Sequence, residues 1–205
     1  GFIKLMADEY QESDELKEVI TLTNELLEEV LSHRNLTLAE NGDLVPKSKH
    51  VELSSLLSRI GQLYQRHPVA KDKSICVSAD HAPALQTDPQ LLKRVVGNML
   101  KNAIEASSPG ETVTLSCECR EQFAMIHVHN SAVIPPDVQL QIFNRSFSTK
   151  SGNGRGIGTY SMKLLGEKYL KGCVWFISNP ESGTTFTISL PLSTEPANDY
   201  SAEKP

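Results

Sequence analysis

The sequence predicts an α+β fold preceded by a helical hairpin, and three observations predict it. Apolar residues recur at helical spacing in the segments before residue 65. They alternate at strand spacing in two later pairs of segments, over residues 113–128 and 174–190. Two further segments, residues 89–106 and 159–169, return to helical spacing. Such a combination of helices and β-hairpins indicates an α+β domain.

The first 40 residues predict a helical hairpin. Ser13 is suited to cap a long helix, and acidic residues follow it in the first turn. The apolar stripe of this helix consists of Leu16, Val19, Ile20, Thr23, Leu26, Leu27, Val30 and Leu31. Residues 2–10 resemble the end of a preceding helix. Because two helices cannot bury such a stripe by themselves, we expect a partner chain to cover it.

Residues 41–50 predict a linker, and the main domain is expected to span residues 51–192. Within it, the pattern predicts a helix over 53–64, a strand over 74–79 and a helix that opens at Asp88-Pro89. A hairpin over 113–128, a helix over 159–169 and a final hairpin over 174–190 follow. The polar tail, residues 193–205, is predicted to be disordered.

The composition excludes several classes of function. The 205 residues carry a formal net charge of -5 and no basic patch, so we expect no nucleic-acid partner. No apolar run approaches the ~20 residues that cross a bilayer, so we expect a cytoplasmic chain without membrane contact. Because the chain begins at Gly1, the sequence does not decide whether a longer parent protein carries a membrane anchor. The four cysteines lack metal-site spacing, and the strand parity of Cys117 and Cys119 predicts buried free thiols.

A polar stripe runs along the helix that opens at Pro89. Its members fall at spacings of three and four residues: Arg94, Asn98, Lys101, Asn102 and Glu105. A solvated helix face is one interpretation. Against it, asparagine is a poor helix former, and two asparagines one turn apart are unusual on a wet surface. An asparagine oxygen is also a suitable ligand for Mg²⁺.

Residues 151–158 form a loop with four glycines in eight residues. Glycine lets the backbone approach phosphate closely, and successive N–H groups bind anions. Thr159 begins a helix whose N-terminus adds to this attraction, and Lys150 and Arg155 are placed to contribute charge. A flexible surface loop is the alternative interpretation. The P-loop lysine and the dinucleotide strand–loop–helix pattern are both missing, which excludes those two kinds of site.

Asn130 lies at the end of a predicted strand, with the parity of its buried positions. A buried amide must find hydrogen-bond partners or it costs about 1–3 kcal/mol. It either caps the turn into Ser131 or recognises the polar edge of a ligand, and the spacing leaves both interpretations open.

Four segments resemble, in order, the motifs of the ATP-binding domain of sensor histidine kinases. The superfamily also includes gyrase, mismatch-repair and heat-shock chaperone ATPases. Residues 98–106 are similar to the N box, and residues 142–150 to the F box and the start of the ATP lid. Residues 154–159 resemble the second glycine box, and residues 183–186 resemble the start of the last strand. The resemblance implies a two-layer α/β sandwich, with helices over one face of a mixed sheet and nucleotide between.

The resemblance also implies a role for each matching residue. Asn102 would coordinate Mg²⁺, with Asn98 and Lys101 near the phosphates, and these three are the expected catalytic residues. Glycines 154, 156 and 158 would wrap the β- and γ-phosphates, and Thr184 would lie near adenine. The lid and pocket would be shaped in part by Phe143, Phe147 and Ile157. The expected ATP contacts are Asn98, Asn102, Glu105, Asn130, Phe143, Phe147, Thr149, Lys150, Gly154, Arg155, Gly156, Ile157, Gly158, Thr159 and Thr184.

The first glycine box of the family is altered in residues 128–135. By strand register Asn130 takes the position of the aspartate that meets adenine, and both glycines are absent; His129 is an alternative alignment. An amide oxygen accepts a hydrogen bond less strongly than a carboxylate does. We therefore expect ATP binding that is weakened and not abolished.

The N-terminal helices are similar to the dimerisation and phosphotransfer hairpin of the same kinases. The phosphoacceptor box is missing, since the one candidate, His33, lies near the end of its helix. We expect no phosphoacceptor in this chain and no autophosphorylation by it. The resemblance implies a homodimeric histidine kinase that moves the γ-phosphoryl of Mg-ATP to a histidine and on to a response regulator aspartate. The alternatives are a degenerate nucleotide-sensing or interaction module and a serine kinase of the anti-sigma type.

Overall fold

The N-terminal unit is a single long helix as far as it is described. The computed structural model describes residues 14–145 and 157–192, and the chain divides into residues 1–44 and 45–205. Helix α2, Asp14–Asn41, confirms the predicted helix after Ser13. Several of its large apolar side chains are exposed: Val19, Ile20, Leu26, Val30 and Leu31. The helix predicted before it, over residues 2–10, lies outside the described residues. No helix in the described ranges has the length and apolar character needed to cross a bilayer.

The second unit alternates helices with strands. It opens with β1, Lys49–Glu52, and α3, Leu53–Gln65, followed by a 3₁₀ turn, Pro68–Ala70. Strands β2, Ser74–Ser78, and β3, Ala84–Thr87, precede α4, Pro89–Ala106. The β4–β5 hairpin, Thr112–Arg120 and Phe123–Asn130, leads into the short α5, Pro136–Gln139. Helix α6, Gly158–Leu164, continues as a π-helical turn, Leu165–Tyr169, before β6, Cys173–Asn179, and β7, Gly183–Pro191.

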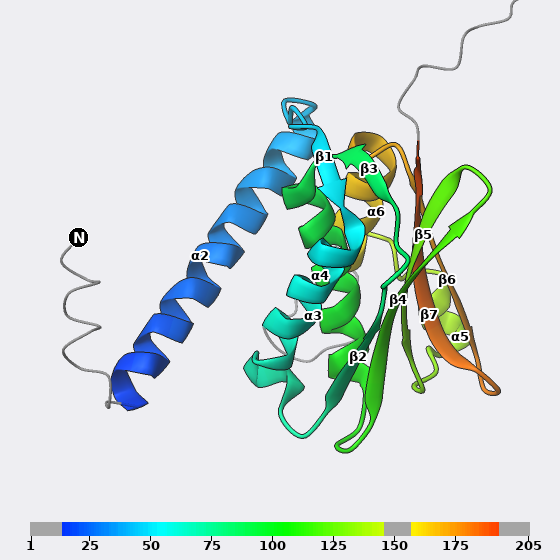
Figure 1. Ribbon diagram of the computed structural model, residues 1–205. Coiled ribbons are helices and arrows are strands. Elements are labelled where there is room, and N and C mark those ends of the chain that lie inside the picture. The colour runs from blue at the N-terminus through cyan, green and yellow to red at the C-terminus, as the bar shows by residue number, and fades with distance from the viewer. Residues whose placement is uncertain (1–13, 146–156, 193–205) are drawn as a thin grey trace, which may run out of the picture. The chain divides into compact units, whose positions relative to one another are not determined.

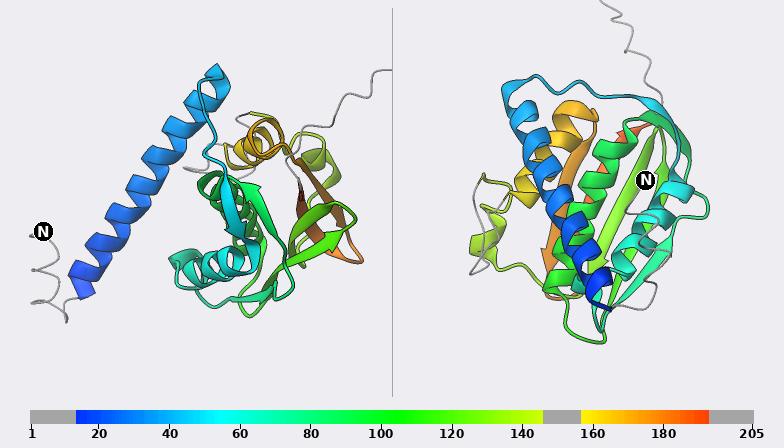
Figure 2. Two further views of the ribbon diagram at one scale, coloured as in Figure 1. Left: turned by 45° about the horizontal axis from the view of Figure 1, so that its top comes forward. Right: turned by 90° about the vertical axis from the view of Figure 1, so that its left-hand side faces the viewer.

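These elements form two layers, as predicted. The five-stranded sheet has the order β2-β4-β5-β7-β6, in which β2 and β4 are parallel and every other pair is antiparallel. Helices α3, α4 and α6 lie over one face of it (Figures 1 and 2). The inward residues of the two central strands are nearly all buried, since side chains alternate across a strand: Ala124, Ile126, Val128, Phe186, Ile188 and Leu190. The core therefore lies between this face and the helices.

Helix α4 is the centre of the helical layer. Its N-cap is Asp88, whose carboxylate accepts hydrogen bonds from the N–H groups of Gln90 and Leu91. Nine of its residues are buried, and they face α3, α6, β4 and β5: Leu91, Leu92, Val95, Val96, Gly97, Met99, Leu100, Ala103 and Ile104. Gly97 lies against Tyr64 of α3, where an added Cβ would come 2.7 Å from the Tyr64 hydroxyl oxygen. The face opposite this core is the polar stripe predicted from the sequence.

Two short strands and one helix were not predicted. Strands β1 and β3 pair antiparallel, with Lys49 opposite Thr87, so the end of the range assigned to the linker forms a strand. Each has four residues, which is too few for a periodic pattern to stand out. Helix α5 also has only four residues. The predicted helix over 159–169 is present, but its second half is a π-helical turn, closed by a bond from the Leu170 N–H to the Leu165 carbonyl.

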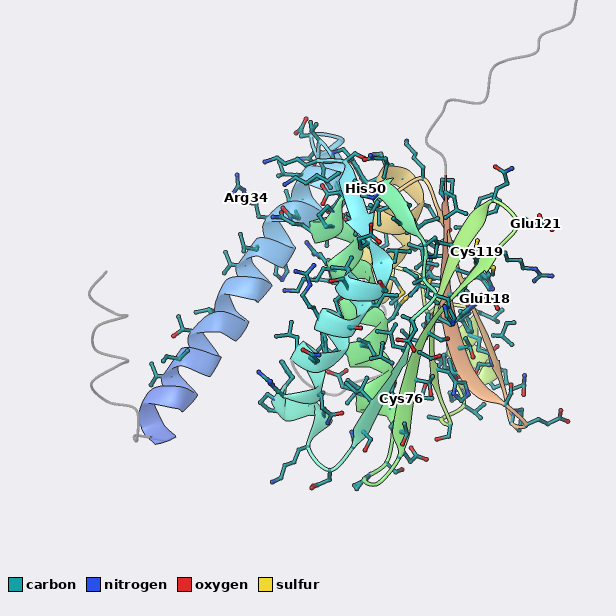
Figure 3. All side chains as sticks on the ribbon, viewed as in Figure 1. Arg34, His50, Cys76, Glu118, Cys119 and Glu121 are labelled. Carbon is teal, nitrogen blue, oxygen red and sulfur yellow. The ribbon has the colours of Figure 1, made fainter. Side chains whose placement is uncertain are left out.

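The prediction of buried thiols is wrong. All four cysteines are free, but Cys76, Cys119 and Cys173 are exposed and Cys117 is only half-buried. Cys119 does share the inward parity of β4, yet it lies near the tip of the β4–β5 hairpin, which extends beyond the helices (Figures 1 and 3). Burial, with smaller effects from Cys119 and Glu118, raises the pKa of the Cys117 thiol to about 11.

Candidate nucleotide-binding site

The polar stripe of α4 meets the end of the glycine-rich loop. The amide nitrogen of Asn98 donates a hydrogen bond to the carbonyl oxygen of Gly158, at a distance of 3.3 Å. These residues are 60 positions apart, and Gly158 is the first residue of α6. Asn98, Asn102 and Glu105 are half-buried on successive turns of α4, whereas Lys101 is exposed. The bond therefore brings the helix stripe and the loop end, which were separate signals in the sequence, into one place.

Asn102 has a buried amide group without a partner. Its Nδ2 atom is inaccessible to water and makes no hydrogen bond to any described residue. Leaving such a group unsatisfied costs about 1–3 kcal/mol, so a ligand that bonds to the amide would recover part of this free energy. Since no bond to a described residue fixes Nδ2, the amide can turn to offer either its nitrogen to a phosphate oxygen or its oxygen to a cation. The residue thus fits a nucleotide carried with Mg²⁺.

The described residues offer no cage of stronger metal ligands. No group of three or more histidine, cysteine, aspartate or glutamate side chains in residues 14–145 and 157–192 could hold a metal ion. Mg²⁺ commonly takes one or two protein oxygens, with phosphate oxygens and water completing its six positions. An asparagine ligand beside a triphosphate is compatible with that requirement.

Arg94 adds positive charge one turn before Asn98. It is half-buried, and burial lowers the pKa of its guanidinium to about 10. The group therefore remains protonated at neutral pH. Together with Lys101, it gives this side of α4 two cations beside the half-buried Glu105.

Asn130 ends the central strand β5 and faces the helices, as its parity predicted. Its side chain is 3% exposed, and its Nδ2 atom has no partner among the described residues. Its backbone is held in the sheet opposite Thr184 of β7. Gly183 packs so closely that an added Cβ would collide with the Asn130 carbonyl oxygen, and its φ of +71° also favours glycine. The backbone of Asn130 is thus fixed, while its amide group is left without a protein partner at the nitrogen.

The loop after Asn130 is held by a chain of hydrogen bonds. The Ile134 N–H donates to the Ser178 hydroxyl oxygen at 2.9 Å, and the Thr184 hydroxyl donates to the Ala132 carbonyl at 2.7 Å. The two hydroxyl oxygens are 2.8 Å apart. Because the Thr184 proton is already directed at Ala132, Ser178 is the donor between them. Both hydroxyls are therefore engaged in holding the loop that stands in place of the first glycine box.

Sequence reasoning missed Ser178 and Gln139 as parts of this support. Gln139 donates from Nε2 to the Ile134 carbonyl at 2.7 Å, a second tie on the same loop. The signal for Ser178 was available, since it follows Val174 and Phe176 at the inward positions of β6, where a polar residue is unexpected. Gln139 had no such signal, because α5 was not predicted.

Phe143 anchors the chain just before the predicted lid. Its ring packs against Phe176 and Phe186, with centroids 5.7 Å and 6.4 Å away, and the Lys163 ammonium nitrogen lies 4.9 Å from its centroid. On the far side of the lid, Ile157 and Thr159 are half-buried at the start of α6. Six expected ATP contacts lie outside the described residues: Phe147, Thr149, Lys150, Gly154, Arg155 and Gly156. The structure thus describes the two ends of the predicted lid.

Comparison with known proteins identifies the family. The family model described as "Histidine kinase-, DNA gyrase B-, and HSP90-like ATPase" matches residues 87–194. The chain belongs to this ATPase family. The matched range includes α4, Asn130, Phe143 and the final hairpin, so every described site residue lies within it. Membership of this ATPase family implies that the domain binds ATP.

Several relatives that match this chain are sensor proteins. Sensor protein DegM of Bacillus sp. (strain B21-2) is 25% identical over 199 residues, which cover 95% of this chain and 50% of the relative. Sensor-like histidine kinase SenX3 of Mycobacterium tuberculosis (strain ATCC 25618 / H37Rv) is 26% identical over 191 residues, 89% of this chain and 46% of the relative. The chain thus spans about half the length of these curated relatives.

Solved structures of low sequence identity share the fold. Acinetobacter baumannii histidine kinase AdeS matches with a TM-score of 0.66 and 17% identity, over 93% of this chain and 91% of that chain. The catalytic domain of histidine kinase ThkA, in a nucleotide-free form, matches with a TM-score of 0.64 and 24% identity, over 71% of this chain and 96% of that chain. These matches agree with the predicted two-layer sandwich.

Proposed function

We propose that this chain is the catalytic part of a histidine kinase of a two-component signalling system. It binds Mg-ATP, and the γ-phosphoryl group passes to a histidine outside this chain and then to an aspartate of a response regulator. The observation that carries the proposal is the pair Asn98 and Asn102, one turn apart on α4, with Asn98 bonded to Gly158 at the end of the glycine loop. The family and the sensor kinases among the relatives support it.

In this proposal the chain contributes position and charge. Because no described residue bonds to Nδ2 of Asn102, its amide can turn its oxygen to Mg²⁺, while Asn98, Lys101 and Arg94 would lie near the phosphates. Mg²⁺, when bound, neutralises charge on the phosphates during transfer. An amide at Asn98 cannot remove a proton from water, which favours transfer to a protein over hydrolysis. The glycines of residues 154–158 are proposed to offer backbone N–H groups to the phosphates.

We further propose a cytoplasmic location, where ATP is available, and a homodimer formed through the N-terminal helices. The exposed apolar side chains of α2, such as Leu26 and Val30, support the dimer, because a second helix would remove them from water. Sedimentation of the 205-residue chain at increasing concentration tests this part. A monomer at every concentration would contradict dimerisation by these residues.

Thermal unfolding with a non-hydrolysable ATP analogue, with Mg²⁺ or with a chelator, tests the nucleotide site. At a concentration about a hundredfold above Kd, binding adds about 2.7 kcal/mol of stability, which raises Tm by about 5–10 °C in a domain of this size. Asn102→Ala is expected to remove the part of the shift that depends on Mg²⁺. Gln90→Ala, which removes an exposed amide from the same helix, is the matched control and is expected to leave the shift unchanged.

Two results would contradict the proposal. One is no stabilisation at millimolar nucleotide, and the other is an equal shift in Asn102→Ala and in the unaltered chain. If nucleotide binds but no phosphoryl group reaches a histidine of the parent kinase added in trans, a nucleotide-sensing module becomes the better description. The tethered loop of Ala132 and Ile134, in place of a glycine box, is the observation that favours that second candidate.

A further inference from the structure

Asn130 places an amide where the sequence resemblance expects the aspartate that meets adenine. We propose that Asn130 makes the site accept guanine as well as adenine nucleotides. This inference rests on the proposed function and on the expectation from the sequence that Asn130 takes the position that meets the purine ring. It adds the substrate class: purine nucleoside triphosphates of both kinds.

The amide of Asn130 is the group left for a ligand at this end of the sheet. Three polar side chains, those of Asn130, Ser178 and Thr184, occupy inward positions at the ends of β5, β6 and β7. The hydroxyls of Ser178 and Thr184 are engaged with each other and with the loop after Asn130. Asn130, by contrast, is 3% exposed and keeps a buried nitrogen without a partner among the described residues. A ligand that contacts Asn130 can therefore accept a hydrogen bond from Nδ2, which no described residue accepts.

The chemistry of an amide differs from that of a carboxylate at the point where the two purines differ. Adenine carries an amino donor at position 6 and an acceptor at N1, whereas guanine carries a carbonyl acceptor at position 6 and a donor at N1. With position 6 of the ring directed at residue 130, as the sequence resemblance implies for adenine, a carboxylate accepts from the adenine amino group and is repelled by the guanine carbonyl. An amide offers one acceptor and two donors, and a half-turn about its last torsion exchanges their places.

Asn130 can therefore form two hydrogen bonds with either base. With adenine, Oδ1 accepts from the amino group while Nδ2 donates to N1; with guanine, Nδ2 donates to O6 while Oδ1 accepts from the N1–H. The half-turn breaks no hydrogen bond between Nδ2 and a described residue, because none is present there. The backbone does not need to move, since its pairing with Thr184 and the close packing of Gly183 hold it in place.

Isothermal titration of the 205-residue chain with non-hydrolysable ATP and GTP analogues, each with Mg²⁺, tests the inference. We expect the two Kd values of the unaltered chain to lie within about tenfold of each other. Asn130→Asp is expected to tighten ATP binding and to weaken GTP binding, so that their ratio exceeds about a hundred. A ratio of about a hundred corresponds to the free-energy cost of leaving one buried polar group without a hydrogen bond.

Asn179→Asp is the matched control, because it adds the same charge to the same sheet. Only the Oδ1 atom of Asn179 is used in its turn, where it accepts from the N–H groups of Glu181 and Ser182, and aspartate keeps that acceptor. We expect this variant to retain the ratio of the unaltered chain. Circular dichroism of both variants checks that they are folded.

The outcomes separate this inference from the proposed function. ATP binding with GTP more than about a hundredfold weaker in the unaltered chain would overturn the inference and leave the proposed function standing. Binding of neither nucleotide would overturn both. A ratio unchanged in Asn130→Asp, with the variant folded, would show that another group reads the base, and would also overturn the inference.

Discussion

The carboxylate of Asp88 accepts hydrogen bonds from three backbone N–H groups. Replacing Asp88 therefore tests how much these three bonds stabilise the domain. Its Oδ1 atom caps α4 by accepting from Gln90 at 2.9 Å and from Leu91 at 3.1 Å. Its Oδ2 atom accepts from the Lys47 N–H at 2.6 Å, in the segment between α2 and β1. Asp88 is buried, so water cannot readily replace these bonds. The same side chain thus holds the helix of Asn98 and the segment that enters the domain.

The expected loss follows from the two kinds of bond. An N-cap is worth about 1 kcal/mol, and a partly buried hydrogen bond to a charged group is worth about 2 kcal/mol. Asp88→Ala loses both, so its free energy of unfolding should fall by about 3 kcal/mol. Asp88→Ser keeps a capping oxygen but cannot also reach Lys47, so it should lose about 2 kcal/mol. With a slope of about 2 kcal/mol/M, these losses lower the urea midpoint by about 1.5 M and 1 M.

Urea titration followed by fluorescence of Trp175 measures both variants. Trp175 is the single tryptophan of the chain and lies in β6, so its signal reports the unit that contains α4. Equal midpoints for the alanine and serine variants would show that the cap contributes nothing. A fall of less than about 0.3 M in both would refute the reasoning altogether, because the bonds would then not outweigh their desolvation.

Two further predictions concern the loop after β5. Gly183→Ala should cost about 3 kcal/mol, from its left-handed backbone and from collision with the Asn130 carbonyl, and it should weaken nucleotide binding. Gly110→Ala, at φ +86° with nothing within 4 Å, should cost only about 1 kcal/mol; equal losses in urea titrations would exclude the collision. The Ser131 hydroxyl, with smaller effects from other groups, holds the pKa of Glu111 below its usual 4.5. The stability that this carboxylate adds is present above pH 4.5 and is lost as pH falls through the pKa of the folded state. In Glu111→Gln, the urea midpoint should therefore depend less on pH below 4.5 than it does in the unaltered chain. An unchanged dependence would contradict this.

Much of the fold could be predicted because its signals are local. The start of α4 at Pro89 follows from Asp88, whose side chain caps the helix within three residues. The hairpins follow from period-two alternation, which reports the buried face directly. The π-helical turn after Leu164 gave no such signal, since its bonds span one residue more than those of the α-helix that the same apolar pattern predicts.

The sequence selected candidate site residues, but it did not predict the contacts that the structure gives them. Asn98 and Asn102 were selected because asparagine is a poor helix former and the two lie one turn apart, and Asn130 because a buried amide is costly without a partner. The hydroxyl of Thr184 donates to the Ala132 carbonyl, and Ser178 links Thr184 to the Ile134 N–H. These bonds join three segments that lie up to 52 residues apart in the sequence, so no local pattern predicts them. The roles of these residues toward a ligand remain predictions that the variants above measure.

The sequence by itself determined the order of the longer elements, the polar stripe of α4 and the motifs of the ATPase family, since periodicity, capping and spacing act within a few residues. Only the tertiary structure decided which of these features meet. It joined Asn98 to Gly158 across 60 residues, paired β1 with β3, and left Cys119 exposed beyond the helices despite its inward parity. The physical reason is that parity and period specify a face of an element, whereas burial and hydrogen bonding depend on what covers that face.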